Sequence, residues 1–209
     1  MTSSPFEGTI RALGIAGSLR EGSYNRALLR AARELAPEGL AIEILDNELL
    51  KRVPLYNEDV RAAGFPEPVV VLKEAIAEAD ALIIATPEYN HSVPGVLKNA
   101  LDWASRPPEE SPLNGKPVAI VGASTGGFGT VRAQMHLRDV CVYNNMHPVN
   151  KPQVLVARAH ETFDGEGRLQ DEAGRRFLRQ QMEALVAWTI RLRNGSSACA
   201  ERVTGLNEA

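Results

Sequence analysis

Short apolar segments alternate with longer amphipathic segments along the whole chain. The short segments are nearly continuous runs of Ile, Val, Leu and Ala, without regular polar alternation. Such runs are typical of strands whose two faces are both covered by helices. They predict five strands, at Ile10–Ala16, Ala41–Leu45, Ala81–Thr86, Pro117–Ala123 and Gln153–Ala157.

The longer segments place apolar residues three and four positions apart, which is the spacing of one helix face. They predict helices at Asn25–Leu35, Pro68–Ala79, Pro94–Ser105, Thr130–Val140 and Asp171–Arg193. Strands that alternate with helices predict an α/β domain with a doubly wound, five-stranded parallel sheet in the order 2-1-3-4-5. Helices then cover both faces of the sheet.

The length of 209 residues suits one compact domain, and no linker or internal repeat divides it. We therefore expect a single domain over residues 1–193. Residues 194–209 are small and polar, and they predict a loosely ordered carboxyl-terminal tail.

Composition excludes several classes of protein. The net charge is −3 and no basic block occurs, which argues against a nucleic-acid partner. No apolar run approaches the roughly 18 residues of a membrane span, and the first residues lack a signal peptide, so we expect a cytoplasmic protein without membrane association. Cys141 and Cys199 form no CxxC pair, and the four histidines show no ligand spacing, so no metal site is expected. One disulfide between the two cysteines stays open.

Ligands of doubly wound sheets bind beyond the carboxyl ends of the strands, where the winding reverses. The loops after the first, third and fourth predicted strands should therefore form the site. The first loop offers hydroxyl, amide and guanidinium groups before a helix, at Ser18, Arg20, Ser23 and Asn25. A helix start with such donors suits a phosphate group. Alternatively, Ser23 is only a helix cap. Neither GxxxxGK[ST] nor GxGxxG occurs, which argues against a P-loop or a dinucleotide fold.

The second loop, residues 86–94, is framed by Pro87 and Pro94, which restrict the backbone between them. Tyr89 offers an aromatic surface, and the amide of Asn90 can both donate and accept. This combination could recognise the pyrimidine edge of a flavin. Ser92 is also expected to cap the helix that follows.

Two long motifs carry a resemblance to a known family. They are Gly-Ser-Leu-Arg-x-Gly-Ser-x-Asn at residues 17–25 and Pro-Glu-Tyr-Asn-His-Ser-Val-Pro-Gly-Val-Leu-Lys-Asn-Ala-Leu-Asp-Trp at residues 87–103. The chain resembles the NADPH-dependent FMN reductase family, and within it the bacterial NAD(P)H quinone and chromate reductases. The likeness spans about residues 10–192 and implies a flavodoxin-like fold.

The resemblance implies one FMN per chain, reduced by NADPH or NADH and reoxidised at the same site by a small acceptor. Such acceptors are quinones, chromate, azo or nitro compounds and free flavin. It implies that Ser18, Arg20, Ser23 and Asn25 hold the FMN phosphate, and that Pro87, Glu88, Tyr89, Asn90 and Ser124 line the isoalloxazine ring. No catalytic side chain is expected, because the flavin supplies the hydride chemistry. A homodimer or homotetramer is also implied.

Two alternatives remain at this stage. A flavodoxin-like electron carrier would bind FMN without using NAD(P)H, although such carriers are usually more acidic. The third loop also matches G-x-S-x-G around Ser124, the nucleophile elbow of serine hydrolases. Asp139 with His147 or His160 follows in the chain order of a triad, but three glycine-rich positions separate the serine from its helix.

Overall fold

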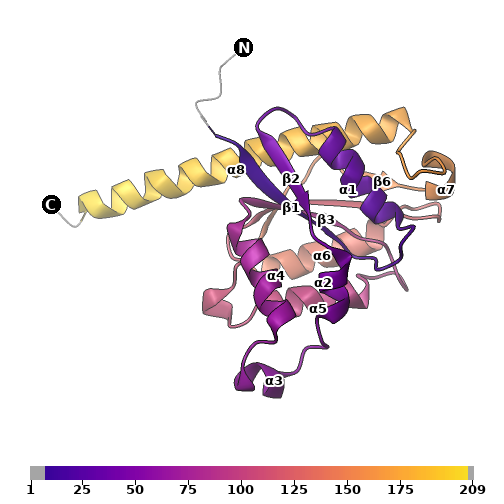
Figure 1. Cartoon of the computed structure of the whole chain (residues 1–209). Helices are drawn as coiled ribbons and strands as arrows, with labels where there is room; N and C mark the ends of the chain where they lie inside the picture. The colour runs from indigo at the N-terminus through magenta and orange to yellow at the C-terminus, as the bar shows by residue number, and fades with distance from the viewer. Residues whose placement is uncertain (1–7, 207–209) are drawn as a thin grey trace, which may run out of the picture.

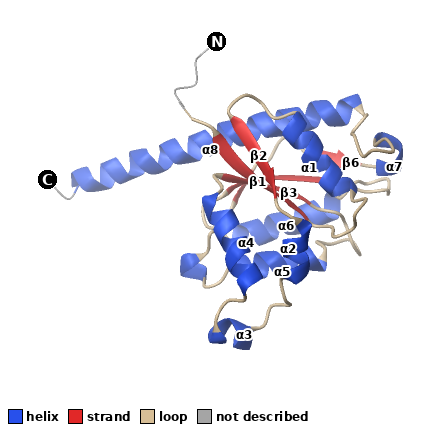
Figure 2. Ribbon diagram, in the orientation of Figure 1, coloured by secondary structure: helices blue, strands red, loops and turns tan. Residues whose placement is uncertain are grey.

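A six-stranded parallel sheet forms the centre of the protein (Figures 1 and 2). This computed structural model describes residues 8–206, so the amino-terminal residues used for the signal-peptide expectation lie outside the described part. Four strands run side by side in the order β2-β1-β3-β4, and β5 and β6 both pair with β4. Their bounds are β1 Ile10–Ala16, β2 Leu40–Ile44, β3 Ala81–Ala85, β4 Pro117–Ala123, β5 His147–Pro148 and β6 Val154–Val156.

Helices cover both faces of the sheet. On one face pack α1 (Tyr24–Glu34) and α8 (Glu172–Leu206), and on the other α2 (Asn47–Arg52), α4 (Glu67–Glu78), α5 (Gly95–Ala104) and α6 (Val131–Tyr143). Two short helices, α3 (Glu58–Ala63) and α7 (Ala159–Thr162), lie in connections. Alternate residues of β3 enter the two cores, with Ile83 facing α1 and Ile84 facing α5. Every residue of β3 and β4 is buried, which explains their unbroken apolar runs.

The predicted topology is confirmed, with one difference at the edge. The order 2-1-3-4-5 holds, but the fifth position is shared by two short strands. β5 pairs with the start of β4 and β6 with its end; β5 ends at Pro148, and Pro152 lies between the two strands. Proline has no N–H to donate to a ladder, so the two prolines weaken continuous pairing along this edge of β4.

The predicted helices occur within a few residues of their expected bounds, except at the carboxyl end. There α8 continues to Leu206, well past the predicted end at Arg193, and Figure 1 shows this part extending away from the body of the molecule. Gly195 marks a weak point of a helix without preventing one, and no proline follows it. The sequence patterns also missed the six-residue helices α2 and α3, which are too short to show a clear period.

No helix within residues 8–206 combines the length and the apolar character needed to cross a membrane. The parallel arrangement places the loops after β1, β3 and β4 along one edge of the sheet. This carboxyl edge is where the sequence predicted the site.

Candidate functional site

The first loop, residues 17–25, turns from β1 into α1 with unused donors at its surface. Ser23 is the N-cap of α1, and its Oγ accepts from the N–H of Arg26 at 3.3 Å. The backbone N–H groups of Tyr24 and Asn25, in the first turn of α1, donate to no group within residues 8–195. Arg20 is exposed and makes no ion pair in the same part of the chain. A phosphate would complete these donors.

Asn25 serves a different contact from the one that the sequence suggested. Its Nδ2 donates to the carbonyl of Ala123, and its Oδ1 accepts from the N–H of Ala123, each at 2.9 Å. The side chain is 3% exposed, so both amide atoms are committed to the last residue of β4. Asn25 therefore joins the first loop to the end of β4 through its side chain, and its backbone N–H is left without a partner within residues 8–195.

A second buried asparagine, Asn47, also holds the first loop in place. The Nδ2 of Asn47, at the start of α2, donates to the carbonyl of Ser18 at 2.8 Å. Gly17 also makes close contact with the second loop, because a Cβ on it would lie 3.1 Å from Pro87, Pro94 and Leu97. Asn47 was not predictable as a site residue, since nothing in the local sequence distinguishes it from an ordinary helix residue.

The second loop contains a two-residue hairpin. Tyr89 and Ser92 exchange both backbone hydrogen bonds, at 3.0 and 3.1 Å. The two residues between them have positive φ, 50° at Asn90 and 62° at His91, as in a type I′ turn. Asparagine tolerates this conformation, whereas histidine does so at a cost. The turn presents Tyr89, which is 51% exposed, beside the carboxyl edge.

Replacing His91 with glycine should stabilise the protein by about 0.5–1 kcal/mol, because glycine adopts a positive φ without strain. Asn90→Gly serves as the comparison and should gain less, since asparagine already tolerates the conformation. Urea unfolding of the parent and the two variants measures both changes. A loss of stability in His91→Gly would show that the imidazole makes a contact worth more than the backbone strain.

Glu88 ties the second loop to α6. One carboxylate oxygen accepts from the backbone N–H groups of Arg132 and Ala133, at 2.9 and 3.2 Å, and the other lies 3.3 Å from the Arg132 guanidinium. The carboxylate thus caps the start of a helix 44 positions later in the chain, where negative charge is favourable. The expected cap by Ser92 on α5 is wrong: Pro94 occupies that N-cap, and Ser92 Oγ lies 3.0 Å from His136 Nδ1.

The end of β4 contacts the second loop at Gly122. A Cβ at this position would lie 2.6 Å from the carbonyl oxygen of Thr86 and would overlap Thr130. Thr86 and Thr130 are both fully buried. The first glycine of the G-x-S-x-G match is therefore required by the close approach of Thr86 and Thr130 to β4.

Ser124 is the first residue after β4, and its surroundings do not form a catalytic triad. Its Oγ accepts from the N–H of Gly126 at 3.1 Å. His147 pairs with Pro117 at the start of β4, which places it roughly 20 Å from Ser124 at the other end of the strand. The Nε2 of His160 lies 3.4 Å from Glu161. None of the histidines hydrogen-bonds Ser124 in the described chain, so the hydrolase alternative has no geometric support.

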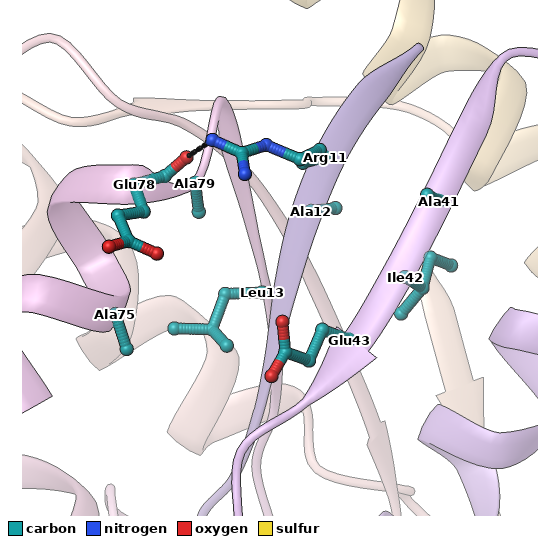
Figure 3. A pocket seen from close by; sticks show the side chains of 9 residues that line it. All are labelled: Arg11, Ala12, Leu13, Ala41, Ile42, Glu43, Ala75, Glu78 and Ala79. Carbon is teal, nitrogen blue, oxygen red and sulfur yellow. Dashed lines mark hydrogen bonds between the residues drawn. The ribbon is translucent and has the colours of Figure 1, made fainter.

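Other reactive groups and cavities lie elsewhere. Cys141 is buried in the core, and burial raises the pKa of its thiol to about 12, so it stays protonated. Cys199 lies in the part of α8 whose side chains are not described. A pocket beside the amino-terminal halves of β1 and β2 is bordered by Arg11, Glu43 and Glu78 (Figure 3), and Arg11 donates to the carbonyl of Glu78 at 2.8 Å. It shares no residue with the three loops.

Comparison with known proteins decides the family. The model of the NADPH-dependent FMN reductase family matches residues 10–161. The chain belongs to this family. An NAD(P)H-dependent FMN reductase of Pseudomonas aeruginosa is 55% identical over 184 residues, covering 88% of this chain and 97% of that protein. A 2-hydroxy-1,4-benzoquinone reductase of a Burkholderia species is 43% identical, covering 83% and 93%.

Solved structures agree with this assignment. The flavoenzyme NAD(P)H:acceptor oxidoreductase FerB of Paracoccus denitrificans is 34% identical, with a TM-score of 0.78 over 88% of this chain and 98% of that one. The chain is thus an NADPH-dependent FMN reductase family member with the flavodoxin-like fold. It is an oxidoreductase of a family that works with FMN and a nicotinamide donor. The carrier alternative is therefore set aside.

Proposed function

We propose that this reductase uses NADPH or NADH to reduce quinones or similar small acceptors through one bound FMN, in a ping-pong reaction. The observation that carries the proposal is the junction of three loops at the carboxyl edge, with free N–H donors at the start of α1. Chromate, azo and nitro compounds and free flavin are further acceptors of the same kind. We assign the reaction to the cytoplasm, where nicotinamide donors are available.

The first loop fits the FMN phosphate. Arg20 supplies charge, the hydroxyls of Ser18 and Ser23 border the loop, and the N–H groups of Tyr24 and Asn25 point out of the helix start. Such a set suits a group that carries about −1.5 to −2 charges near neutral pH. The side chain of Asn25 would hold the loop in place rather than bind phosphate.

The second and third loops fit the ring. The backbone of Pro87, Glu88, Tyr89 and Asn90 is fixed by the hairpin and by the Glu88 carboxylate, so its polar groups are held ready for the ring edge. Ser124 lies at the start of the third loop, where the surrounding glycines leave room for a flat ligand. FMN, when bound, would supply the hydride chemistry, and these residues would orient it and limit the access of water.

We also propose a homodimer or homotetramer. The support is a set of large apolar side chains exposed on α6, where Met135 is 51% exposed and Val142 is 78% exposed. Such residues on one helix are typical of a surface that another molecule covers.

The test is the visible spectrum of the purified protein, followed by anaerobic addition of NADPH. We expect the two bands of oxidised flavin and their bleaching by the donor. A protein that is colourless and also fails to take up added FMN would refute the proposed function.

Arg20→Ala tests the phosphate site. We expect an approximately 10- to 100-fold rise in the Kd for FMN, because a charge-assisted contact to the phosphate is lost. Riboflavin lacks the phosphate, so its Kd should not change. Arg30→Ala, exposed farther along α1, is the matched control. Flavin fluorescence quenching measures all four values, and equal losses for both flavins would place the phosphate elsewhere.

A further inference from the structure

The third loop carries one large apolar side chain that packs into neither core. Phe128 is 71% exposed and follows two glycines. The next residue, Gly129, has a φ of 60° and lies so close to Leu155 that a Cβ would approach its backbone to 3.1 Å. The backbone that carries the Phe128 side chain is therefore packed against Leu155.

Arg132 lies beside this ring and links it to the second loop. Its guanidinium carbon is 5.3 Å from the centre of the Phe128 ring, a cation–π distance. One guanidinium nitrogen contacts Glu88 at 3.3 Å, and the group makes no other hydrogen bond within residues 8–195. The side chain is 42% exposed, so part of the guanidinium remains available to a ligand. Because Glu88 directly precedes the exposed Tyr89, the side chains of Phe128, Arg132 and Tyr89 border the same end of the site.

We propose that Phe128 and Arg132 select the electron acceptor, favouring flat quinones that carry an ionised ring oxygen. The ring of Phe128 would stack on the quinone, and the guanidinium would bind the oxyanion. A hydroxyquinone is ionised at neutral pH, and its charge spreads over two ring oxygens, either of which can accept a hydrogen bond from the guanidinium of arginine. This inference rests on the proposed function and names the acceptor class of that same site.

The overall reaction conserves electrons and protons. NAD(P)H loses one hydride, which is two electrons and one proton, and becomes NAD(P)⁺. The hydroxyquinone gains two electrons and two protons and becomes the hydroquinone, the second proton coming from solvent. Phe128 and Arg132 exchange neither electrons nor protons; they hold the acceptor.

Phe128→Leu tests the stacking role. Stopped-flow mixing should still show complete flavin bleaching at saturating NADPH, whereas the KM for 2-hydroxy-1,4-naphthoquinone rises about 3- to 10-fold. Tyr143→Leu is the matched control, because Tyr143 is also 71% exposed and contacts Arg106, but lies at the far end of α6. An unchanged KM in Phe128→Leu would overturn the stacking role. So would a lower mass in analytical ultracentrifugation, since the ring would then belong to a subunit interface.

Arg132→Gln tests the charge preference and leaves the backbone N–H that Glu88 binds. The ratio of kcat/KM for 2-hydroxy-1,4-naphthoquinone to that for the uncharged 2-methyl-1,4-naphthoquinone should fall about tenfold or more. An equal loss for both quinones would overturn the selection. If NADPH fails to bleach the flavin even in the unmodified protein, the proposed function itself fails; normal bleaching with an unchanged ratio overturns only this inference.

Discussion

Asn25→Ala is expected to lower the free energy of unfolding by about 2–4 kcal/mol. The substitution removes both partners of Ala123 at once and leaves a buried N–H and a buried carbonyl without a hydrogen bond. It also separates the first loop from the third, so the Kd for FMN should rise together with the loss of stability. Urea unfolding of the FMN-free protein gives the stability without the contribution of bound cofactor.

The control for this prediction is Asn150→Ala. Asn150 is exposed and accepts from Arg138 at the surface, so its removal should change stability by no more than about 0.5 kcal/mol. If Asn25→Ala unfolds at the same urea concentration as the parent while losing FMN, then its amide contacts the phosphate directly and the link to Ala123 is unimportant.

Gly122→Ala is expected to have the largest effect of a single added methyl group, with a loss of about 3 kcal/mol or more. The Cβ would meet the backbone oxygen of Thr86 at 2.6 Å and overlap a fully buried Thr130, so the two loops that hold these threonines must move away from β4. FMN binding should be lost with them. Gly127→Ala is the matched control in the third loop, because a Cβ at that position meets nothing within 4 Å.

A second variant separates steric overlap from other causes. Gly122→Ala combined with Thr130→Ala removes the overlapping hydroxyl but keeps the contact with Thr86, so part of the lost stability should return. Thermal unfolding of the parent, the two single variants and the double variant gives the coupling between the sites. A Gly122→Ala protein within about 1 kcal/mol of the parent would show that the loops can move apart cheaply.

Sequence patterns predicted the strands well because burial on both faces requires an unbroken run of apolar residues. β1 and β4 begin and end at their predicted residues, and each is apolar almost throughout. The division of the fifth strand into two pieces was harder to predict, since the two residues of β5 are too few to show a pattern. The G-x-S-x-G match around Ser124 shows the same limit. The spacing of two glycines and a serine could not reveal that Gly122 must be glycine because the carbonyl oxygen of Thr86 lies so close to it.

The loops of the site were located by topology, but the direction of their side chains was not predictable. Asn25 and Glu88 lie where expected along the chain, yet their polar atoms contact residues 98 and 44 positions away. Such partners depend on how distant strands are brought together. Ser23, by contrast, was weighed as a cap from local sequence alone and is one.

The interrupted strand pair beside β4 affects how the protein behaves in a crowded solution. A long, regular strand at a sheet edge offers a row of free N–H and carbonyl groups to strands of other molecules, which promotes aggregation. Here that edge consists of pieces of two and three residues, with prolines at 148 and 152 that cannot donate. The protein can therefore accumulate, or refold after losing its cofactor, with little tendency to nucleate fibrils at this edge.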